Sequence, residues 1–383
     1  MNITKLLKYF SGVILSLILS KANATSIPSG ATISWSTDEN DTCVATLVLP
    51  TLPIPNEGTT NKTSMLAFII SQKDEILSRY NKNGLIVLRD FPFEDNNEAK
   101  RLFNKLTDSR PGNTKGPLGF LPGWVQLAAQ DLALTVMLRF LDGKRSGGLS
   151  ALAPASRNVQ GPHQEGQLFR WRWPEVGFFV ELAPVSLGET VFYHAPSAFQ
   201  ALPPALQLKV SETHYSYHSH LNFLYDYMPP WMYKMTLKVG AGMMNNEATW
   251  VPMVLKSPVS NESSLQFFGF GKNINKIAAD AFNKAYPGRN AVPCNDYYGE
   301  YFIRPATACV KQPVETEKKF TQEEEVAILK AFMESSFMLR WKTNDFVLVD
   351  NIRWAHGRAN GDNSPRVLHF YHSQPMKDVF SLT

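Results

Sequence analysis

In the first third of the chain, two segments have apolar residues at helical spacing, and a short continuous apolar run lies between them. Residues 64–79 carry apolar side chains that fit a helical period, and residues 96–106 predict a second helix. Between them, residues 84–89 (GLIVLR) are a short apolar run after a glycine, which predicts a buried strand. The folded part of the chain is therefore expected to open with helix, strand and helix.

Three later runs rich in β-branched and aromatic residues predict further strands. They are residues 176–182, 346–350 and 366–372, each bounded by turn residues. Strands this far apart in sequence are typical of a Greek-key or jelly-roll sheet.

Helix signals fill residues 205–340, which lie between two of these strands. The clearest is Thr321 followed by Glu324 three residues later, which predicts a capping box at the start of a helix. Upstream, residues 112–123 hold four glycines and two prolines and predict a loop near the middle of the structure.

The first 24 residues have the layout of a signal peptide. Lys5 and Lys8 precede an apolar stretch over residues 10–19, and the small-residue sequence Ala22-Asn23-Ala24 follows. The stretch is shorter than the roughly 20 residues that cross a bilayer, so no stable membrane anchor is expected. The prediction is entry into the secretory pathway or export, with a hydrophobic N-terminal helix of a cytoplasmic protein as the alternative.

Residues 25–62 are rich in Thr, Ser, Pro and Asn, and proline without periodicity disfavours both helix and central strand. We therefore expect a loosely packed lead-in before a domain over residues 63–383. Three cysteines cannot form a disulfide framework, although Cys294 and Cys309 can pair in an oxidising compartment.

The composition indicates a globular protein that is not built to bind nucleic acid. Of 383 residues, 44% are hydrophobic, which is enough for a sizeable core. Lys and Arg total 38 against 34 Asp and Glu, and no basic run stands out. No glycine-rich phosphate loop is present, so a kinase or dehydrogenase has no support.

Two His and one carboxylate form the candidate metal site. In an extended strand, His163 and Glu165 point to the same face because they are two residues apart. The third ligand is suggested by His356, which follows a hydrophobic strand. Such a triad binds iron(II) on one side and leaves the other open for O2 and a bidentate 2-oxo acid. Arg366, ten residues further on, supplies the positive charge that a dicarboxylate requires.

Several blocks of the sequence resemble the taurine dioxygenase (TauD/TfdA) family, including its plant clavaminate synthase-like relatives. The matching blocks are residues 84–91, 162–165, 172–174, 178–179, 188–190, 345–351 and 356–358. The resemblance implies a mainly β fold with flanking helices, the double-stranded β-helix or jelly roll, with a mixed insertion at about residues 205–340. It also implies an Fe(II)- and 2-oxoglutarate-dependent dioxygenase that oxidises a small organic substrate, most often by hydroxylation, and releases succinate and CO2.

Carried over by position, the resemblance makes His163, Glu165 and His356 the iron ligands. Arg366 and Thr190 would bind the distal carboxylate of 2-oxoglutarate, although residues 186–190 keep only the second glycine of the family's Gly-Gly-x-Thr pattern. Arg358 would contact the co-substrate or, with equal support, only orient the end of its strand.

Other interpretations stay open from the residues alone. The same triad can hold the zinc of a hydrolase, or the jelly roll can bind without catalysis. His214, His218 and His220 suggest a second metal site, with ordinary partly buried histidines as the alternative. The nearby aromatics Tyr225, Tyr227, Trp231 and Tyr233 can line a pocket for an apolar or cationic substrate or belong to the core.

Overall fold

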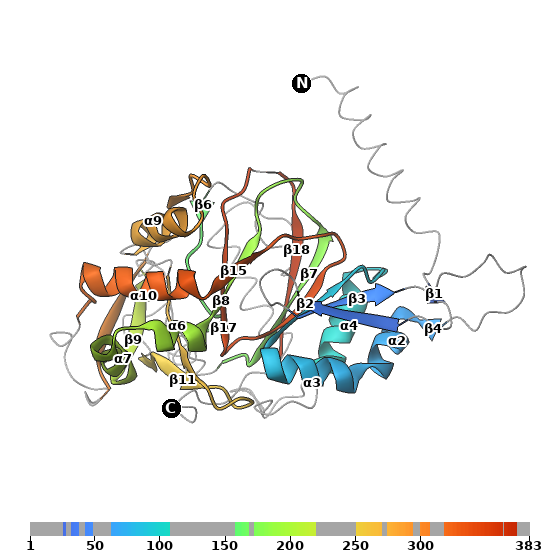
Figure 1. Cartoon of the computed structure of the whole chain (residues 1–383), viewed down its shortest axis with the longest axis horizontal. Helices are drawn as coiled ribbons and strands as arrows, with labels where there is room; N and C mark the ends of the chain where they lie inside the picture. The colour runs from blue at the N-terminus through green and yellow to red at the C-terminus, as the bar shows by residue number, and fades with distance from the viewer. Residues whose placement is uncertain are drawn as a thin grey trace, which may run out of the picture.

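Two facing β-sheets form the centre of the computed structural model, and helices cover them on both sides (Figure 1). The structure describes residues 26–27, 32–37, 43–48, 63–107, 158–167, 172–219, 250–269, 274–293, 299–306, 318–362 and 364–373. The predicted signal peptide, the loop at 112–123, Cys294, Cys309, His220 and the aromatics at 225–233 lie outside these residues. None of the described helices is long and apolar enough to span a membrane.

The larger sheet has six strands in the order β18-β7-β16-β5-β3-β2. Their bounds are Val367–His372, Glu175–Leu182, Phe346–Asp350, Leu85–Arg89, Cys43–Val48 and Thr32–Thr37. All pairs are antiparallel except β3 with β5. The four strands predicted from the sequence (β5, β7, β16 and β18) are confirmed within a residue or two.

The smaller sheet has the order β15-β8-β17, with bounds Ser336–Leu339, Thr190–His194 and Trp354–Arg358. Alternate side chains of the two sheets meet in one buried cluster, as the two-residue period of a strand requires. From the larger sheet it includes Leu85, Val87, Val176, Phe178, Val180, Val347, Val349 and Leu368, and from the smaller sheet Phe192, Phe337 and Leu339. This two-sheet barrel confirms the predicted jelly roll.

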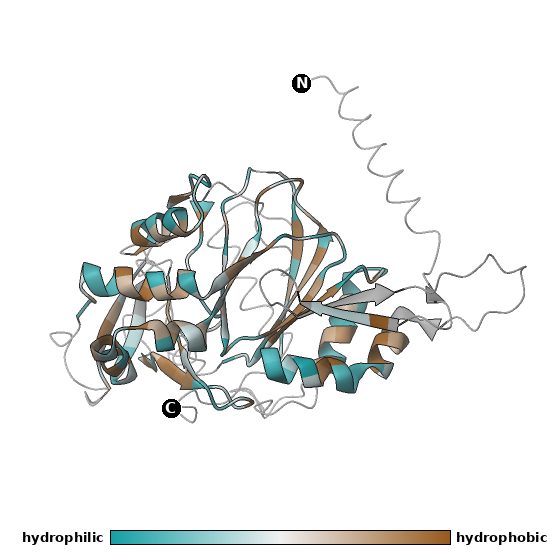
Figure 2. Cartoon of the chain, in the orientation of Figure 1, coloured by the Kyte–Doolittle hydropathy of each residue, from teal (hydrophilic) through white to brown (hydrophobic). Residues whose placement is uncertain are grey.

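Helices α2 (Met65–Ser71), α3 (Lys73–Asn83) and α4 (Asn96–Thr107) cover the outer face of the larger sheet. The single helix predicted over residues 64–79 is wrong in one respect, because the structure divides it at Gln72. The two helices differ in hydropathy: α2 is almost entirely apolar, whereas α3 is largely hydrophilic (Figure 2). The helix predicted at 96–106 is confirmed as α4.

The prediction of a loosely packed lead-in over residues 25–62 is wrong for two segments. Strands β2 and β3 form a hairpin that extends the larger sheet from β5. Trp35 of β2 packs against the core of this sheet, and the Arg79 guanidinium of α3 lies 4.4 Å from its ring centroid. The strand propensity of residues 32–37 (TISWST) and 43–48 (CVATLV) decides here, because the prolines lie beyond both strands.

The remaining described elements lie beside the smaller sheet and include both helices and strands. They are α6 (Ala195–Ala201), α7 (Pro204–Ser211), β9 (Thr213–Ser219), β10 (Val251–Pro252), β11 (Val254–Lys256), β12 (Ser263–Leu265), α9 (Asn275–Ala285), β13 (Val292–Pro293), β14 (Gly299–Pro305) and α10 (Gln322–Glu334). Short pairs are formed by β1 (Ser26–Ile27) with β4 (Thr63–Ser64), and by β6 (Asn158–Val159) with β13.

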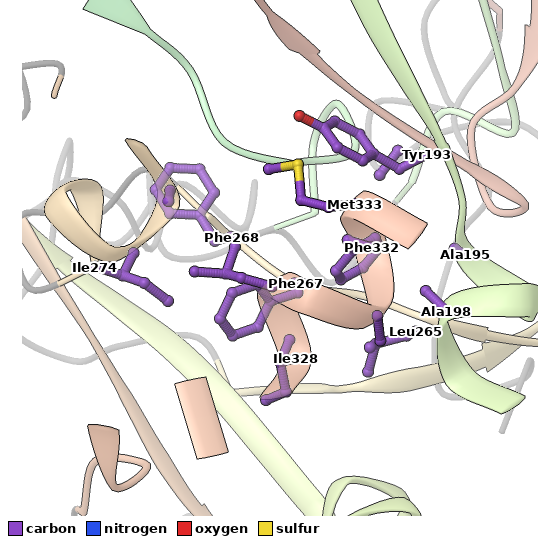
Figure 3. Packing of buried hydrophobic residues seen from close by; sticks show 14 of the residues in the cluster. Tyr193, Ala195, Ala198, Leu265, Phe267, Phe268, Ile274, Ile328, Phe332 and Met333 are labelled. Atoms are coloured by element: carbon purple, nitrogen blue, oxygen red, sulfur yellow. The ribbon is translucent and has the colours of Figure 1, made fainter. Parts of the chain in front are cut away.

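Helix α10 attaches this region to the barrel. Figure 3 shows Ile328, Phe332 and Met333 of α10 among buried residues that include Tyr193 of β8 and Phe267. The predicted capping box is present, since the Thr321 side chain accepts from the Glu324 backbone and the Glu324 side chain accepts from that of Thr321. The region is therefore packed onto the back of the smaller sheet.

Candidate metal centre

His163, Glu165 and His356 converge at one end of the space between the two sheets. Their ligand atoms all lie within 4.8 Å of one another. Oε1 of Glu165 is 3.4 Å from Nε2 of His356 and 3.9 Å from Nε2 of His163. Metal–ligand bonds to N and O are about 2.0–2.2 Å, so one ion between these atoms can reach all three. This is the only such group among the described residues.

The backbone holds the two histidines side by side. The His163 amide donates to the His356 carbonyl at 3.0 Å, and the His356 amide donates to the His163 carbonyl at 2.8 Å. Beyond this isolated bridge the chain leaves the extended conformation, and Glu165 begins a turn that includes Gly166 at φ 70°. The prediction of one strand carrying both His163 and Glu165 is therefore wrong, although the turn still directs Glu165 to the histidines.

The surroundings of His163 and Glu165 favour the forms that bind a metal, a neutral imidazole and an ionised carboxylate. Nδ1 of His163 lies 3.1 Å from the Gly161 carbonyl, which only accepts, so this nitrogen carries the proton and Nε2 offers its lone pair. Burial and the neighbouring His356 lower the pKa of His163 to about 3. Burial alone raises the pKa of Glu165, but the hydrogen bond and charge of His356 outweigh it and lower that pKa overall.

Asn351 clamps the turn that carries Glu165. Its side chain is fully buried, and Oδ1 accepts from the Glu165 amide at 2.9 Å. Nδ2 donates to the carbonyls of Glu165 and Trp173, both at 2.8 Å. Asn351 thus joins the β16–β17 turn, the Glu165 turn and the start of β7 at one point. The sequence placed Asn351 in a matching block, but no local signal in one sequence indicates this role.

The β16–β17 turn is itself fixed to α3. Asp350 accepts from the amides of Ile352 and Arg353 and from Nε of Arg353 at 2.9 Å. The buried Arg353 guanidinium then donates to the last carbonyls of α3, those of residues 80, 81 and 82. The Tyr80 carbonyl also accepts from the Gly84 amide at the end of the helix. Arg353 therefore adds donors to the last turn of α3 and carries a charge suited to a helix C-terminus.

A close approach of backbones explains the glycine after His356. A Cβ on Gly357 would lie 2.4 Å from the carbonyl oxygen of Gln160 and 2.9 Å from that of Gly161. A Cβ on Gly161 would in turn lie 2.0 Å from the Gly269 carbonyl oxygen. Only glycine allows the three segments to pack this closely, and the spacing of the two histidines depends on that packing.

The other candidate residues lie deeper in the barrel. Thr190 and Arg358 are paired across β8 and β17, two residues from Phe192 and His356 on the same face. Oγ1 of Thr190 accepts from the Trp341 indole at 3.1 Å, and Arg366 donates to the Gly188 carbonyl at 2.9 Å. Thr190, Arg358 and Arg366 are all buried. The structure therefore brings all six predicted site residues into the same barrel, with the arginines at one end.

Of the two predicted site arginines, Arg358 has fewer interactions that offset its positive charge. Its Nε forms no hydrogen bond, and no carboxylate pairs with Arg358 in the part of the chain that the structure describes. An arginine that is 8% exposed and faces the interior of the barrel favours an anion as its partner.

The histidines at 214 and 218 lie on strand β9, in register with β14 rather than with the barrel sheets. His214 belongs to no second group of metal ligands among the side chains that the structure describes, and the side chain of His218 lies outside them. The site is thus confined to the triad in that part of the chain.

Residues 59–372 match the model of the taurine catabolism dioxygenase TauD, TfdA family. No match was found among curated protein sequences. The crystal structure of AAD-2 in complex with Mn(II) and N-oxalylglycine is 12% identical, with a TM-score of 0.50, and covers 91% of this chain and 99% of its own. PvcB from Pseudomonas aeruginosa is 14% identical, with a TM-score of 0.47 and coverage of 91% and 94%.

At these identities the likeness to AAD-2 shows a shared fold. The family model covers most of the chain, so the protein belongs to the TauD/TfdA family. It is an Fe(II)- and 2-oxoglutarate-dependent dioxygenase, which acts on a small molecule and uses O2. The predicted family, fold class and cofactors are thereby confirmed, and the zinc hydrolase and the non-catalytic binding protein are not favoured.

Proposed function

We propose that the protein hydroxylates a small organic substrate with iron(II) held by His163, Glu165 and His356. The observation that carries this proposal is the convergence of two imidazoles and one carboxylate, with His163 neutral and Glu165 ionised. Iron(II) in such a site supplies the activation of O2, coupled to oxidative decarboxylation of 2-oxoglutarate to succinate and CO2. One oxygen atom then enters succinate and the other enters the substrate as a hydroxyl group.

The chain's own residues position the two organic reactants. Arg366, Thr190 and Arg358 lie at the cationic end of the barrel and are proposed to bind the distal carboxylate of 2-oxoglutarate. The support is their shared burial, the pairing of Thr190 with Arg358, and the lack of a carboxylate partner for Arg358. A bidentate arginine fixes a carboxylate in direction as well as in distance.

The buried aromatic rings around His356 exclude water from the reacting atoms. Phe178 stands edge-on to His356 with ring centroids 5.1 Å apart, and Phe192 lies 6.5 Å from it. A dry site strengthens the electrostatic interactions within it and protects reactive species from water.

The co-substrate assignment is tested by the dependence of succinate formation on 2-oxoglutarate concentration. Arg366→Ala is expected to raise the concentration required for half-maximal rate by at least tenfold, the effect of one lost charged hydrogen bond of about 1.5–3 kcal/mol. Arg358→Ala is expected to shift it in the same direction. Arg340→Ala, an exposed arginine, is the matched control. Unchanged dependence in both barrel variants would assign the carboxylate to other residues.

Hydroxylation is tested by product mass under ¹⁸O₂. A product heavier than its substrate by one ¹⁸O atom supports the proposal. A product that has lost two hydrogens and gained no oxygen would make the enzyme a desaturase or cyclase.

We also propose that residues 1–24 are a cleaved signal peptide and that the mature protein acts in the secretory pathway or after export. The support is the order of Lys5 and Lys8, the apolar stretch and the small residues that follow. Intact mass and N-terminal sequencing of protein expressed in its own host check it. A mature chain that begins at Met1 would contradict it.

A further inference from the structure

The side chains that face the interior of the barrel differ between its two ends, as the register of the strands shows. Along β17 and β8, the inward positions pass from Arg358 and Thr190 to His356 and Phe192. Along β18, they pass from Leu368 through Phe370 to His372, six residues beyond Arg366. Arg366 directly precedes the first residue of β18 and His372 is its last residue, so the two stand at opposite ends of the strand. The arginines therefore lie at one end and His372 at the other.

Phe370 and His372 face the same interior as the ligand triad. Phe370 is paired with Phe178 across β18 and β7, and their ring centroids are 5.6 Å apart. Phe178 also contacts His356, so Phe370 is one ring removed from a proposed iron ligand. The adjacent β18 residues His369 and Tyr371 point to the opposite face, where His369 contacts Glu181 and Tyr371 joins the outer core.

His372 continues this aromatic wall toward Glu165. Its imidazole stacks on the buried Trp173 with centroids 4.6 Å apart and an interplanar angle of 23°, and it lies 6.3 Å from Phe370. Trp173 is linked through Asn351 to the turn that carries Glu165. Trp173, His372, Phe370 and Phe178 thus form a continuous surface beside the metal centre.

The four residues of this aromatic surface differ in how far they are buried. Phe178 and Trp173 are buried, whereas Phe370 and His372 are only half-buried although they point inward. Part of each of these two inward-pointing side chains therefore remains accessible. The inward positions of β7 and β18 at this level, from Val176 to His372, include no carboxylate, lysine or arginine.

We propose that Phe370 and His372 form the substrate-binding wall of this dioxygenase and that the substrate presents a planar, uncharged group, such as an aromatic ring, to them. This inference rests on the proposed function, because it takes the arginine end for 2-oxoglutarate and leaves the aromatic end for the molecule that is oxidised. Stacking on Phe370 and His372 supplies the affinity.

Three small probes separate shape from charge. Benzyl alcohol is planar and neutral, cyclohexylmethanol is neutral but not planar, and benzoate is planar but anionic. Each is titrated into the full protein with iron(II) and 2-oxoglutarate under anaerobic conditions, and its dissociation constant is measured by saturation-transfer NMR. The visible charge-transfer band of the iron–2-oxoglutarate complex is recorded in the same samples.

The wild-type protein is expected to bind benzyl alcohol more tightly than either comparison probe. Phe370→Leu keeps apolar volume but loses the ring, and His372→Gln keeps a hydrogen-bonding group but loses the planar face. Each is expected to weaken benzyl alcohol binding by roughly two- to tenfold, the range for one aromatic contact, and to reduce its advantage over cyclohexylmethanol. His369→Gln, on the opposite face of the same strand, is the matched control and is expected to change neither value.

Two results would overturn the inference while the proposed function stands. One is tightest binding of benzoate, which would place a cation at this wall. The other is equal binding of benzyl alcohol by Phe370→Leu, His372→Gln and His369→Gln while the band is normal. Absence of the band in the wild-type protein would instead contradict the proposed iron and 2-oxoglutarate site itself.

Discussion

Replacement of Asn351 by alanine tests how far the iron site depends on a residue that cannot touch the metal. The Asn351 side chain forms three hydrogen bonds, two with the backbone of Glu165 and one with the Trp173 carbonyl. All three are lost in Asn351→Ala, and the Asn351 side chain that would be removed is fully buried. The turn that carries Glu165 is then released from the β16–β17 turn.

The size of the effect follows from these contacts. At about 0.5–1.5 kcal/mol for each hydrogen bond, the free energy of unfolding is expected to fall by roughly 2–4 kcal/mol. Loss of a partner that orients a metal ligand typically weakens metal binding by roughly tenfold to a hundredfold. Asn351→Ala is therefore expected to bind iron(II) more weakly by that factor.

A matched control separates stability from ligand positioning. Asn283 forms a similar clamp in α9, accepting from the Ala291 amide at 2.8 Å and donating to the Ala291 carbonyl at 2.9 Å. Asn283→Ala is expected to lower the free energy of unfolding by roughly 1–3 kcal/mol without a change in iron affinity. Iron affinity is measured by anaerobic competition with a coloured chelator, and stability by urea unfolding. Wild-type iron affinity in folded Asn351→Ala would show that the iron site does not depend on Asn351.

Three further changes test other parts of the structure. Gly357→Ala places a Cβ 2.4 Å from the Gln160 carbonyl oxygen, so we expect a loss of about 1–3 kcal/mol in stability and weaker iron binding by the same chelator assay; unchanged affinity would show that the backbones tolerate separation. Thr321→Ala removes the cap of α10 and is expected to cost about 1 kcal/mol in urea unfolding, with no change in iron affinity. Burial raises the pKa of Glu325 above its ordinary 4.5, against the opposing effect of the hydrogen bond from Tyr301. The protonated form of Glu325 therefore stabilises the fold below about pH 4.5, and this contribution is lost as pH rises above that value. The stability of the wild-type protein relative to Glu325→Gln is expected to fall accordingly, and a difference that does not change with pH would contradict this.

The proposed metal ligands could be predicted from the sequence because the types of the residues and their order along the chain are sufficient to suggest them. Two histidines and a carboxylate in His163-Gln-Glu165 and His356, with Arg366 beyond, needed no knowledge of the backbone. The conformation of the first pair was not predictable in the same way. Extended spacing and a turn both bring Glu165 toward His163, and only the tertiary bonds to Asn351 decide between them.

The fold was predictable where burial on both faces leaves continuous apolar runs, as in β5, β7 and β16. It was less so for residues 32–48, where strands precede a proline-rich stretch, and for the break at Gln72, which no glycine or proline marks. The close packing around Gly357 and the aromatic wall of Phe370 and His372 depend on which strands become neighbours. Strand register sets both, and register between distant strands is not contained in local spacing.

We propose above that His163, Glu165 and His356 hold iron(II) so that 2-oxoglutarate can chelate the metal. Anaerobic titration of the purified protein with iron(II) and 2-oxoglutarate tests this proposal most directly. We expect a weak visible charge-transfer band that saturates with one iron per chain and is absent in His163→Ala and His356→Ala, while both variants remain folded. Failure of the wild-type protein to form the band, together with tight binding of zinc in its place, would contradict the claim.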